Sequence, residues 1–175
     1  LVKGKFDQNI NEVEVDNNSN WCRSHWHSLE LNYTKADYFE SYRDFFEGVY
    51  KKRWNKLVDL NWAIIEFLLK ELGINKEVAL SSNLNFTLGG TDLLIEMCRK
   101  INGDTYLSGL QAKTYVDLEK FKVAGLKHIF MKFNYPTYKQ LHGDFIPNLS
   151  IIDVLFNCGS EETRRLLENN IEFEE

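Results

Sequence analysis

Apolar side chains recur at helical spacing through the first part of the chain, with polar positions between them. This pattern predicts helices over residues 21–33, 38–52 and 55–72, the last of which ends at Gly73. The middle helix carries a dense stripe of aromatic side chains, which at this spacing is more typical of a buried core than of a cofactor site. The N-terminal part is therefore predicted to be a helical assembly.

From residue 77 onward the pattern changes to short β-type runs that alternate with helices. Strands are predicted near residues 78–81, 104–108 and 127–133, with a helix in each of the two connections. Such alternation is typical of βαβ units and of a parallel sheet. The predicted fold class is α/β, helix-rich, with a small parallel Rossmann-like sheet.

The composition narrows the class of protein. A chain of 175 residues can bury a core of its own, and we expect one domain over residues 1–175. The three cysteines are far apart in the sequence and form no C-x-x-C pair, which favours a reducing, cytoplasmic compartment. The net charge of −5 argues against a nucleic-acid partner, and no stretch approaches the roughly 20 apolar residues of a membrane span.

Several familiar catalytic motifs are missing from the sequence. It contains no G-x-S-x-G, no P-loop, no G-x-G-x-x-G and no H-E-x-x-H. His25 and His27 flank a tryptophan, but on a helix two residues at this spacing point away from each other and do not share a metal ion. No metal site and no cofactor are predicted.

Small, polar and aromatic residues crowd together in residues 105–159, which also hold both prolines. Ligands of open parallel sheets bind beyond the carboxyl ends of the strands, so the residues that follow the predicted strands are the candidates. Lysine and hydroxyl side chains next to a glycine suit a phosphate-bearing ligand. The predicted ligand-binding residues at this edge are Ser108, Gly109, Lys113, Tyr115 and Tyr135.

A second polar cluster follows in residues 135–147, where rigid and aromatic residues favour a packed wall or lid over a flexible linker. Tyr138, Gln140 and His142 are predicted to contact an acceptor. His142 is the candidate general acid or base, with Asp144 to orient it; the alternative is a surface histidine in a turn.

Asp153 stands in an apolar run, residues 149–159, that predicts a short buried helix. A buried acid needs a partner. It either accepts hydrogen bonds from the neighbouring loop, which we favour, or points into the ligand site.

Several longer motifs resemble the WbqC-like proteins of bacteria. They are NEVEVDN followed by Trp21 and Trp26, TDLLIEMC, TYLSG followed by Lys113 and Tyr115, the Tyr135-Pro136-x-Tyr138-x-Gln140 element, and the closing run FIPNLSIIDVLFNCG. The resemblance covers nearly the whole chain. WbqC-like proteins occur with genes for O-antigen and other surface polysaccharides, and a glycine-transferring role has been proposed for them.

The start of the chain departs from the family pattern. The family begins with a segment that contains histidine, glutamine and proline, followed by tyrosine, leucine, proline and tryptophan, and this sequence lacks it. Residues 10–15 are strand-like and resemble a continuation rather than a beginning. We therefore expect truncation at the N-terminus, with a βα portion of the sheet missing.

Two functions follow from these observations. In the first, the protein is a cytoplasmic transferase of surface-polysaccharide biosynthesis whose small-molecule substrate is a nucleotide sugar or a similar phosphate-bearing donor of a sugar or aminoacyl group, such as glycyl. In the second, it is a non-catalytic binding or scaffold partner, with Tyr135 and Tyr138 as interface anchors. A third interpretation makes the same residues a tightly turned core without a cavity.

Overall fold

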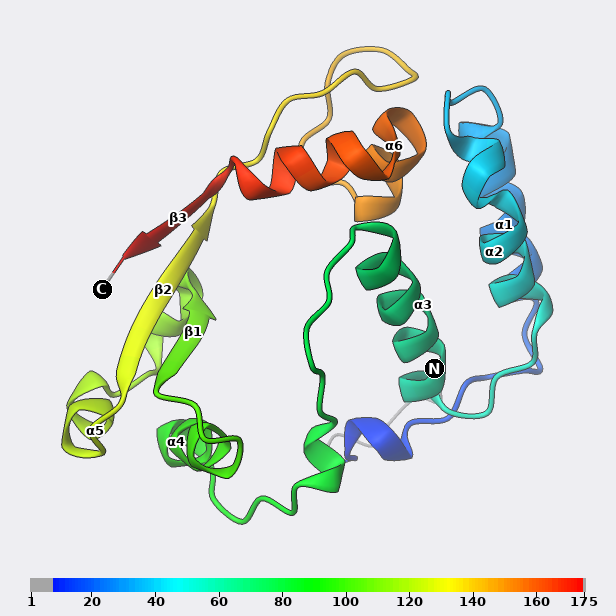
Figure 1. Ribbon diagram of the computed structural model, residues 1–175. Coiled ribbons are helices and arrows are strands. Elements are labelled where there is room, and N and C mark those ends of the chain that lie inside the picture. The colour runs from blue at the N-terminus through cyan, green and yellow to red at the C-terminus, as the bar shows by residue number, and fades with distance from the viewer. Residues whose placement is uncertain (1–7, 175) are drawn as a thin grey trace. The chain divides into compact units, whose positions relative to one another are not determined.

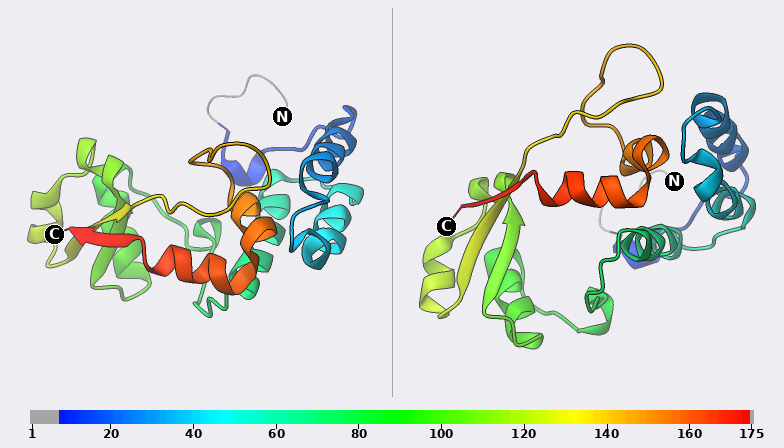
Figure 2. Two further views of the ribbon diagram at one scale, coloured as in Figure 1. Left: turned by 90° about the horizontal axis from the view of Figure 1, so that it is seen from above. Right: turned by 45° about the horizontal axis from the view of Figure 1, so that its top comes forward.

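The computed structural model describes residues 8–174, and they divide into two compact units (Figures 1 and 2). The helical unit contains residues 8–76 and 137–166. The sheet unit contains residues 77–136 and 167–174. The chain therefore leaves the helical unit after residue 76, forms most of the sheet unit, and returns to the helical unit at residue 137. It enters the sheet unit again at residue 167, where it forms the last strand.

The helical unit follows the apolar periodicity of the sequence closely. Its elements are η1 (Ile10–Glu12), α1 (Trp21–Tyr33), α2 (Phe39–Lys51), α3 (Leu57–Glu71) and most of α6 (Ile151–Glu168). The three predicted N-terminal helices are confirmed to within two residues at each end. The strand-like stretch at residues 10–15 is not confirmed as a strand. Instead, the Glu12 carboxylate accepts a hydrogen bond from the Asn9 N–H at 3.2 Å and closes a helical turn there.

Aromatic rings fill the core of this unit. The ring of Phe156 on α6 contacts Tyr33, Phe39, Tyr42 and Phe46, with centroid separations between 5.2 and 6.3 Å. Phe39, Phe46 and Phe156 are fully buried. The aromatic stripe of α2 is thus core, as the sequence predicted, and α6 supplies the residue around which it packs.

The sheet unit is a small mixed sheet with helices. Its elements are η2 (Ser81–Asn83), α4 (Gly90–Lys100), β1 (Thr105–Gly109), η3 (Leu110–Thr114), α5 (Leu118–Val123), β2 (Lys127–Phe133) and β3 (Ile171–Glu174). The order is β1-β2-β3; β1 and β2 are parallel, and β2 and β3 are antiparallel. The predicted fold class, helix-rich α/β with a small sheet built on a parallel pair, is confirmed.

Two details of the predicted sheet are wrong. No strand forms at residues 78–81: Val78 is 48% and Leu80 39% exposed, and the polar run Ser81–Asn83 forms η2 instead. The third strand is β3, which is hard to predict because four residues that alternate apolar and acidic give a weak signal. Such a short, charged strand suits a sheet edge.

Gly159 interrupts α6 with a backbone conformation that side chains rarely adopt (φ 74°, ψ 173°). A Cβ atom there would lie 2.7 Å from the Tyr38 ring, so the site has neither the conformational freedom nor the space for one. Although α6 has 18 residues, neither it nor another helix within residues 8–174 has the length and apolar character to cross a bilayer.

Gly159→Ala should destabilise the protein by at least the ~1–3 kcal/mol of such backbone strain, because the ring of Tyr38 must also move. Gly48→Ala is the matched control: Gly48 lies within α2 with open space around its Cα, and alanine there should stabilise by about 0.5–1 kcal/mol. Chemical denaturation of both variants measures the difference. Equal effects of the two substitutions would contradict the constraint at Gly159.

Candidate functional site

The predicted site residues fall into both units. Those of the sheet unit are Ser108, Gly109, Lys113, Tyr115 and Tyr135. Those of the helical unit are Tyr138, Gln140, His142 and Asp144.

Ser108 lies next to the end of β1, with its side chain on the face of the sheet that carries His128. In the parallel register Tyr106 lies beside His128 and Ser108 beside Phe130, so these four side chains share one face. The Ser108 Oγ atom is 3.2 Å from Nε2 of His128. Ser108 is a ligand-binding candidate from the sequence, but its hydrogen bond to His128 cannot be read from the sequence pattern.

The surroundings of His128 decide how this hydrogen bond is made. Burial lowers the pKa of His128, and its ring packs against Tyr106, Phe121 and Phe130 at 4.4–5.6 Å between centroids. Its Nδ1 atom is buried and has no hydrogen-bond partner among residues 8–174. Because a buried unpaired N–H costs more than a buried unpaired lone pair, the proton of the neutral ring belongs on Nε2.

His128 therefore donates through Nε2–H to the Ser108 oxygen. This direction leaves the hydroxyl hydrogen of Ser108 free to donate to a ligand. It also argues against Ser108 as a nucleophile, since a base would need its lone pair, not its proton, directed at the hydroxyl. The pair is a donor site rather than a nucleophile and base.

Gly109 and Lys113 extend this donor site. A Cβ atom at Gly109 would meet nothing within 4 Å, so the backbone after Ser108 is open to approach. The Lys113 ammonium lies 5.1 Å above the ring of Phe130, the register neighbour of Ser108, and pairs with the Glu174 carboxylate of β3. Buried Ala112 anchors η3, which carries Lys113.

Tyr115 and Tyr135 are more exposed than a pocket wall would be, at 69% and 63%. Tyr135 makes an edge-to-face contact with Phe133 at the end of β2. Beside it, the Asn134 side chain donates to the Glu172 carboxylate at 2.6 Å. The acidic side chains of β3 thus pair with the lysine ammonium and the asparagine amide near this end of the sheet. Only recognition of the strand IEFE could have predicted this pairing.

In the helical unit the buried carboxylate of Asp153 is the centre of a polar cluster. Asp153 is 4% exposed in the first turn of α6. Its two oxygens accept hydrogen bonds from the Tyr33 hydroxyl at 2.7 Å, the Tyr138 hydroxyl at 2.7 Å and the Gln140 amide at 3.1 Å. The loop supplies two of these donors, as we favoured from the sequence, and Tyr33 of α1 is an unforeseen third.

Gln140 also closes the loop on itself. Its Nε2 donates to the Ile146 carbonyl at 2.9 Å, and its Oε1 accepts from the Ile146 N–H at 2.8 Å. The side chain therefore pairs with the backbone as a neighbouring strand would. Tyr138 and Gln140 face Asp153 and the loop backbone in this structure, so they shape the loop that carries His142.

Both tyrosines of the cluster remain protonated donors at neutral pH. Burial, together with the hydrogen bond to Asp153, raises the pKa of Tyr138 to about 12. The same causes, burial first, raise the pKa of Tyr33 further. The carboxylate thus has three stable donors and needs no counter-ion.

His142 and Asp144 are both exposed on this loop. The Nε2 atom of His142 lies 3.0 Å from the Asn32 carbonyl, whereas Asp144 makes no hydrogen bond or ion pair with any residue in 8–174. Donation to the carbonyl leaves a lone pair on Nδ1 in the neutral ring, which a base requires. His142 stays a candidate acid or base, oriented by the backbone of α1.

The two histidines of α1 lie in different surroundings. His25 packs edge-on against Trp21 and Tyr50, at 5.4 and 6.1 Å between ring centroids. His27 lines a pocket between α1 and α2. Within the described part of the chain, no three histidine, cysteine or acidic side chains gather as a metal site.

Comparison with known proteins places the chain in a family. The model of the WbqC-like protein family matches residues 1–165. The chain belongs to the WbqC-like protein family. This WbqC-like protein is 34% identical over 162 residues to the uncharacterized protein Rv1507c of Mycobacterium tuberculosis, an alignment that covers 91% of this chain and 70% of that protein. No solved structure matches the chain.

Tyr33→Phe in this WbqC-like protein should lower the free energy of unfolding by about 1.5–3 kcal/mol, because it removes a hydrogen bond to a buried charge. Tyr42→Phe is the matched control, since Tyr42 is also buried in the helical unit and its hydroxyl bonds to no other described residue. Urea denaturation compares the two variants. If both lose the same stability, the Asp153 cluster does not depend on its donors.

Acid should destabilise this WbqC-like protein through His128. The folded-state pKa is lowered below 6.5, so below pH 6.5 the unfolded chain binds more protons and the free energy of unfolding falls as the pH falls. His128→Gln should flatten this dependence, whereas His27→Gln, an exposed control, should not. Thermal unfolding between pH 7.5 and 5, roughly the range over which an ordinary histidine titrates, provides the measurement. Identical pH dependence in wild type and His128→Gln would contradict a partly buried ring that is harder to protonate in the folded state.

Proposed function

We propose that the protein is a cytoplasmic transferase of bacterial surface-polysaccharide biosynthesis that binds its activated donor at the carboxyl end of β1. The donor carries a sugar or an aminoacyl group, such as glycyl, on a phosphate. Membership of the WbqC-like family supports the biosynthetic setting. The observation that carries the proposal is the Ser108 hydroxyl, which His128 orients so that its hydrogen is free for an anionic ligand.

Three features next to one another suit a donor phosphate. Ser108 offers an O–H, the backbone at Gly109 is open, and Lys113 offers a positive charge above the neighbouring strand. Lys113 and Glu174 are both nearly half-exposed, and a surface pair of this kind contributes only about 0–1 kcal/mol. A phosphate can therefore replace the Glu174 carboxylate at little cost.

These groups also fit the chemistry of transfer. When the bond between the transferred group and the phosphate oxygen breaks, negative charge develops on the phosphate. A fixed O–H donor and a lysine close to that oxygen stabilise the leaving group more than the ground state. Ser108 and Lys113 act in this proposal by electrostatics and not by covalent attack.

Isothermal titration calorimetry with uridine diphosphate, nucleotide sugars and a non-hydrolysable glycyl-adenylate analogue tests the donor site. We expect saturable binding of at least one ligand, weakened about tenfold by Lys113→Ala, which corresponds to one charge-assisted hydrogen bond. Lys122→Ala is the control, because Lys122 is an exposed lysine of α5 without a described ion pair. Absence of heat with every ligand, or unchanged affinity in Lys113→Ala, would refute the assignment.

The exposed aromatic residues favour a second candidate, a non-catalytic binding partner of a biosynthetic enzyme. Tyr115 and Tyr135 are both more than 60% exposed in the sheet unit, as interface anchors would be. Tyr138 is not such an anchor, because its hydroxyl bonds to Asp153. The same calorimetry separates the two functions, since a partner of this kind has no need to bind a nucleotide.

A further inference from the structure

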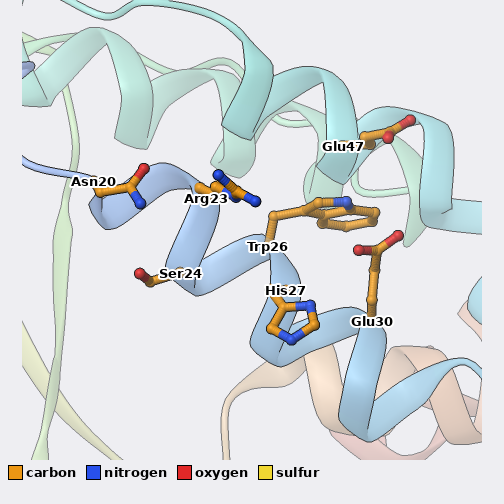
Figure 3. Close-up of a pocket in the computed structure, with 7 residues that line it drawn as sticks. All are labelled: Asn20, Arg23, Ser24, Trp26, His27, Glu30 and Glu47. Atoms are coloured by element: carbon orange, nitrogen blue, oxygen red, sulfur yellow. The ribbon is translucent and has the colours of Figure 1, made fainter.

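A pocket of about 500 Å³ lies between α1 and α2 in the helical unit. Polar residues from one face of α1 line it, and Trp26 and Glu47 complete it (Figure 3). Its volume falls in the range of roughly 300–1,000 Å³ that is usual for small-molecule sites. None of its residues belongs to the site proposed above.

Trp26 provides a supported aromatic surface in this pocket. Its ring stacks on Phe39 at 6.2 Å with an interplanar angle of 18°, and the Tyr50 ring lies at the same centroid distance. Figure 3 shows the indole between the carboxylates of Glu30 and Glu47. The core thus holds the ring in place while part of it faces the pocket.

The two carboxylates are held by neighbouring cations. Glu30 pairs with Arg43 at 3.4 Å, and Glu47 pairs with Lys51 at 2.8 Å. Their side chains are only 32% and 28% exposed, so both are partly desolvated acceptors with restricted orientation. Because each already has a cation, neither requires one from a ligand.

Three hydrogen-bond donors also line this pocket. The guanidinium of Arg23, the ring of His27 and the side-chain amide of Asn20 make no hydrogen bond or ion pair with another residue in 8–174. The pocket therefore offers acceptors and donors together, with both signs of charge. Glu30 and Glu47 would repel an anionic ligand, and Arg23 would repel a cationic one.

A neutral ligand with many hydroxyl groups satisfies this arrangement best. Each hydroxyl both donates and accepts, so it can use carboxylates and a guanidinium at once. A pyranose ring also has a face of weakly positive C–H groups, which complements the negative face of an indole. We propose that the pocket between α1 and α2 binds a neutral saccharide, with its ring on Trp26 and its hydroxyls on Glu30, Glu47 and Arg23.

This inference goes beyond the proposed transferase, because it concerns a different unit and a ligand without phosphate. The sheet unit can fail to bind a nucleotide while this pocket binds a sugar, and the reverse also holds. A saccharide bound here would be a fitting acceptor for the transfer. Its binding does not require the transfer to occur.

Nuclear magnetic resonance of the full chain with a panel of neutral methyl glycosides tests the proposal. The probes are the methyl glycosides of glucose, galactose, rhamnose and N-acetylglucosamine, with inorganic phosphate and ethylammonium as ionic comparisons. We expect at least one glycoside to shift the indole N–H signal of Trp26 saturably. No saturable shift with any glycoside, or saturation by phosphate or ethylammonium alone, would overturn the assignment.

Variants locate the binding, followed through the proton signals of the bound glycoside. Trp26→Leu keeps an apolar side chain on Phe39 but removes the aromatic face, and Glu47→Gln removes one acceptor charge from the pocket. Each should weaken binding about tenfold, which corresponds to 1.4 kcal/mol. Glu66→Gln, an exposed glutamate of α3, is the control and should bind as wild type does. Unchanged binding in both Trp26→Leu and Glu47→Gln would place the sugar elsewhere.

Discussion

The hydrogen bonds to the buried carboxylate of Asp153 are the interactions on which the helical unit most depends. The charge of this carboxylate is removed from water, so it must be satisfied by donors that come from elsewhere in the chain. Tyr33 brings α1 to it, and Tyr138 and Gln140 bring the loop before α6. One side chain therefore fixes three segments, and the position of His142 on that loop is a consequence.

The aromatic core and the break in α6 belong to the same arrangement. Phe156 and Asp153 lie about one helical turn apart on α6, so the ring enters the core where the carboxylate meets its donors. Gly159 then ends the first part of α6 directly against Tyr38. Because the polar cluster and the aromatic core share α6, a shift of this helix would disturb both.

The two proposed sites use different physical means. At the end of β1, a histidine held neutral by burial directs its proton at Ser108 and leaves that hydroxyl as a donor. Between α1 and α2, a tryptophan backed by the core lies among carboxylates that already have cations. The first arrangement favours an anionic ligand, and the second favours a neutral polyol.

The sequence alone determined the features that depend on local pattern. The three N-terminal helices, the parallel pair of strands and the WbqC-like family follow from apolar spacing and long motifs, because periodicity acts over a few residues. The tertiary structure decided which polar groups meet. Asp153 and Tyr33 are 120 residues apart in sequence, and Ser108 and His128 are 20 apart. Residues 78–81 pair with no strand, whereas the short β3 pairs with β2. The pairing of buried polar groups and of edge strands is set by long-range packing, and no local pattern along the chain encodes it.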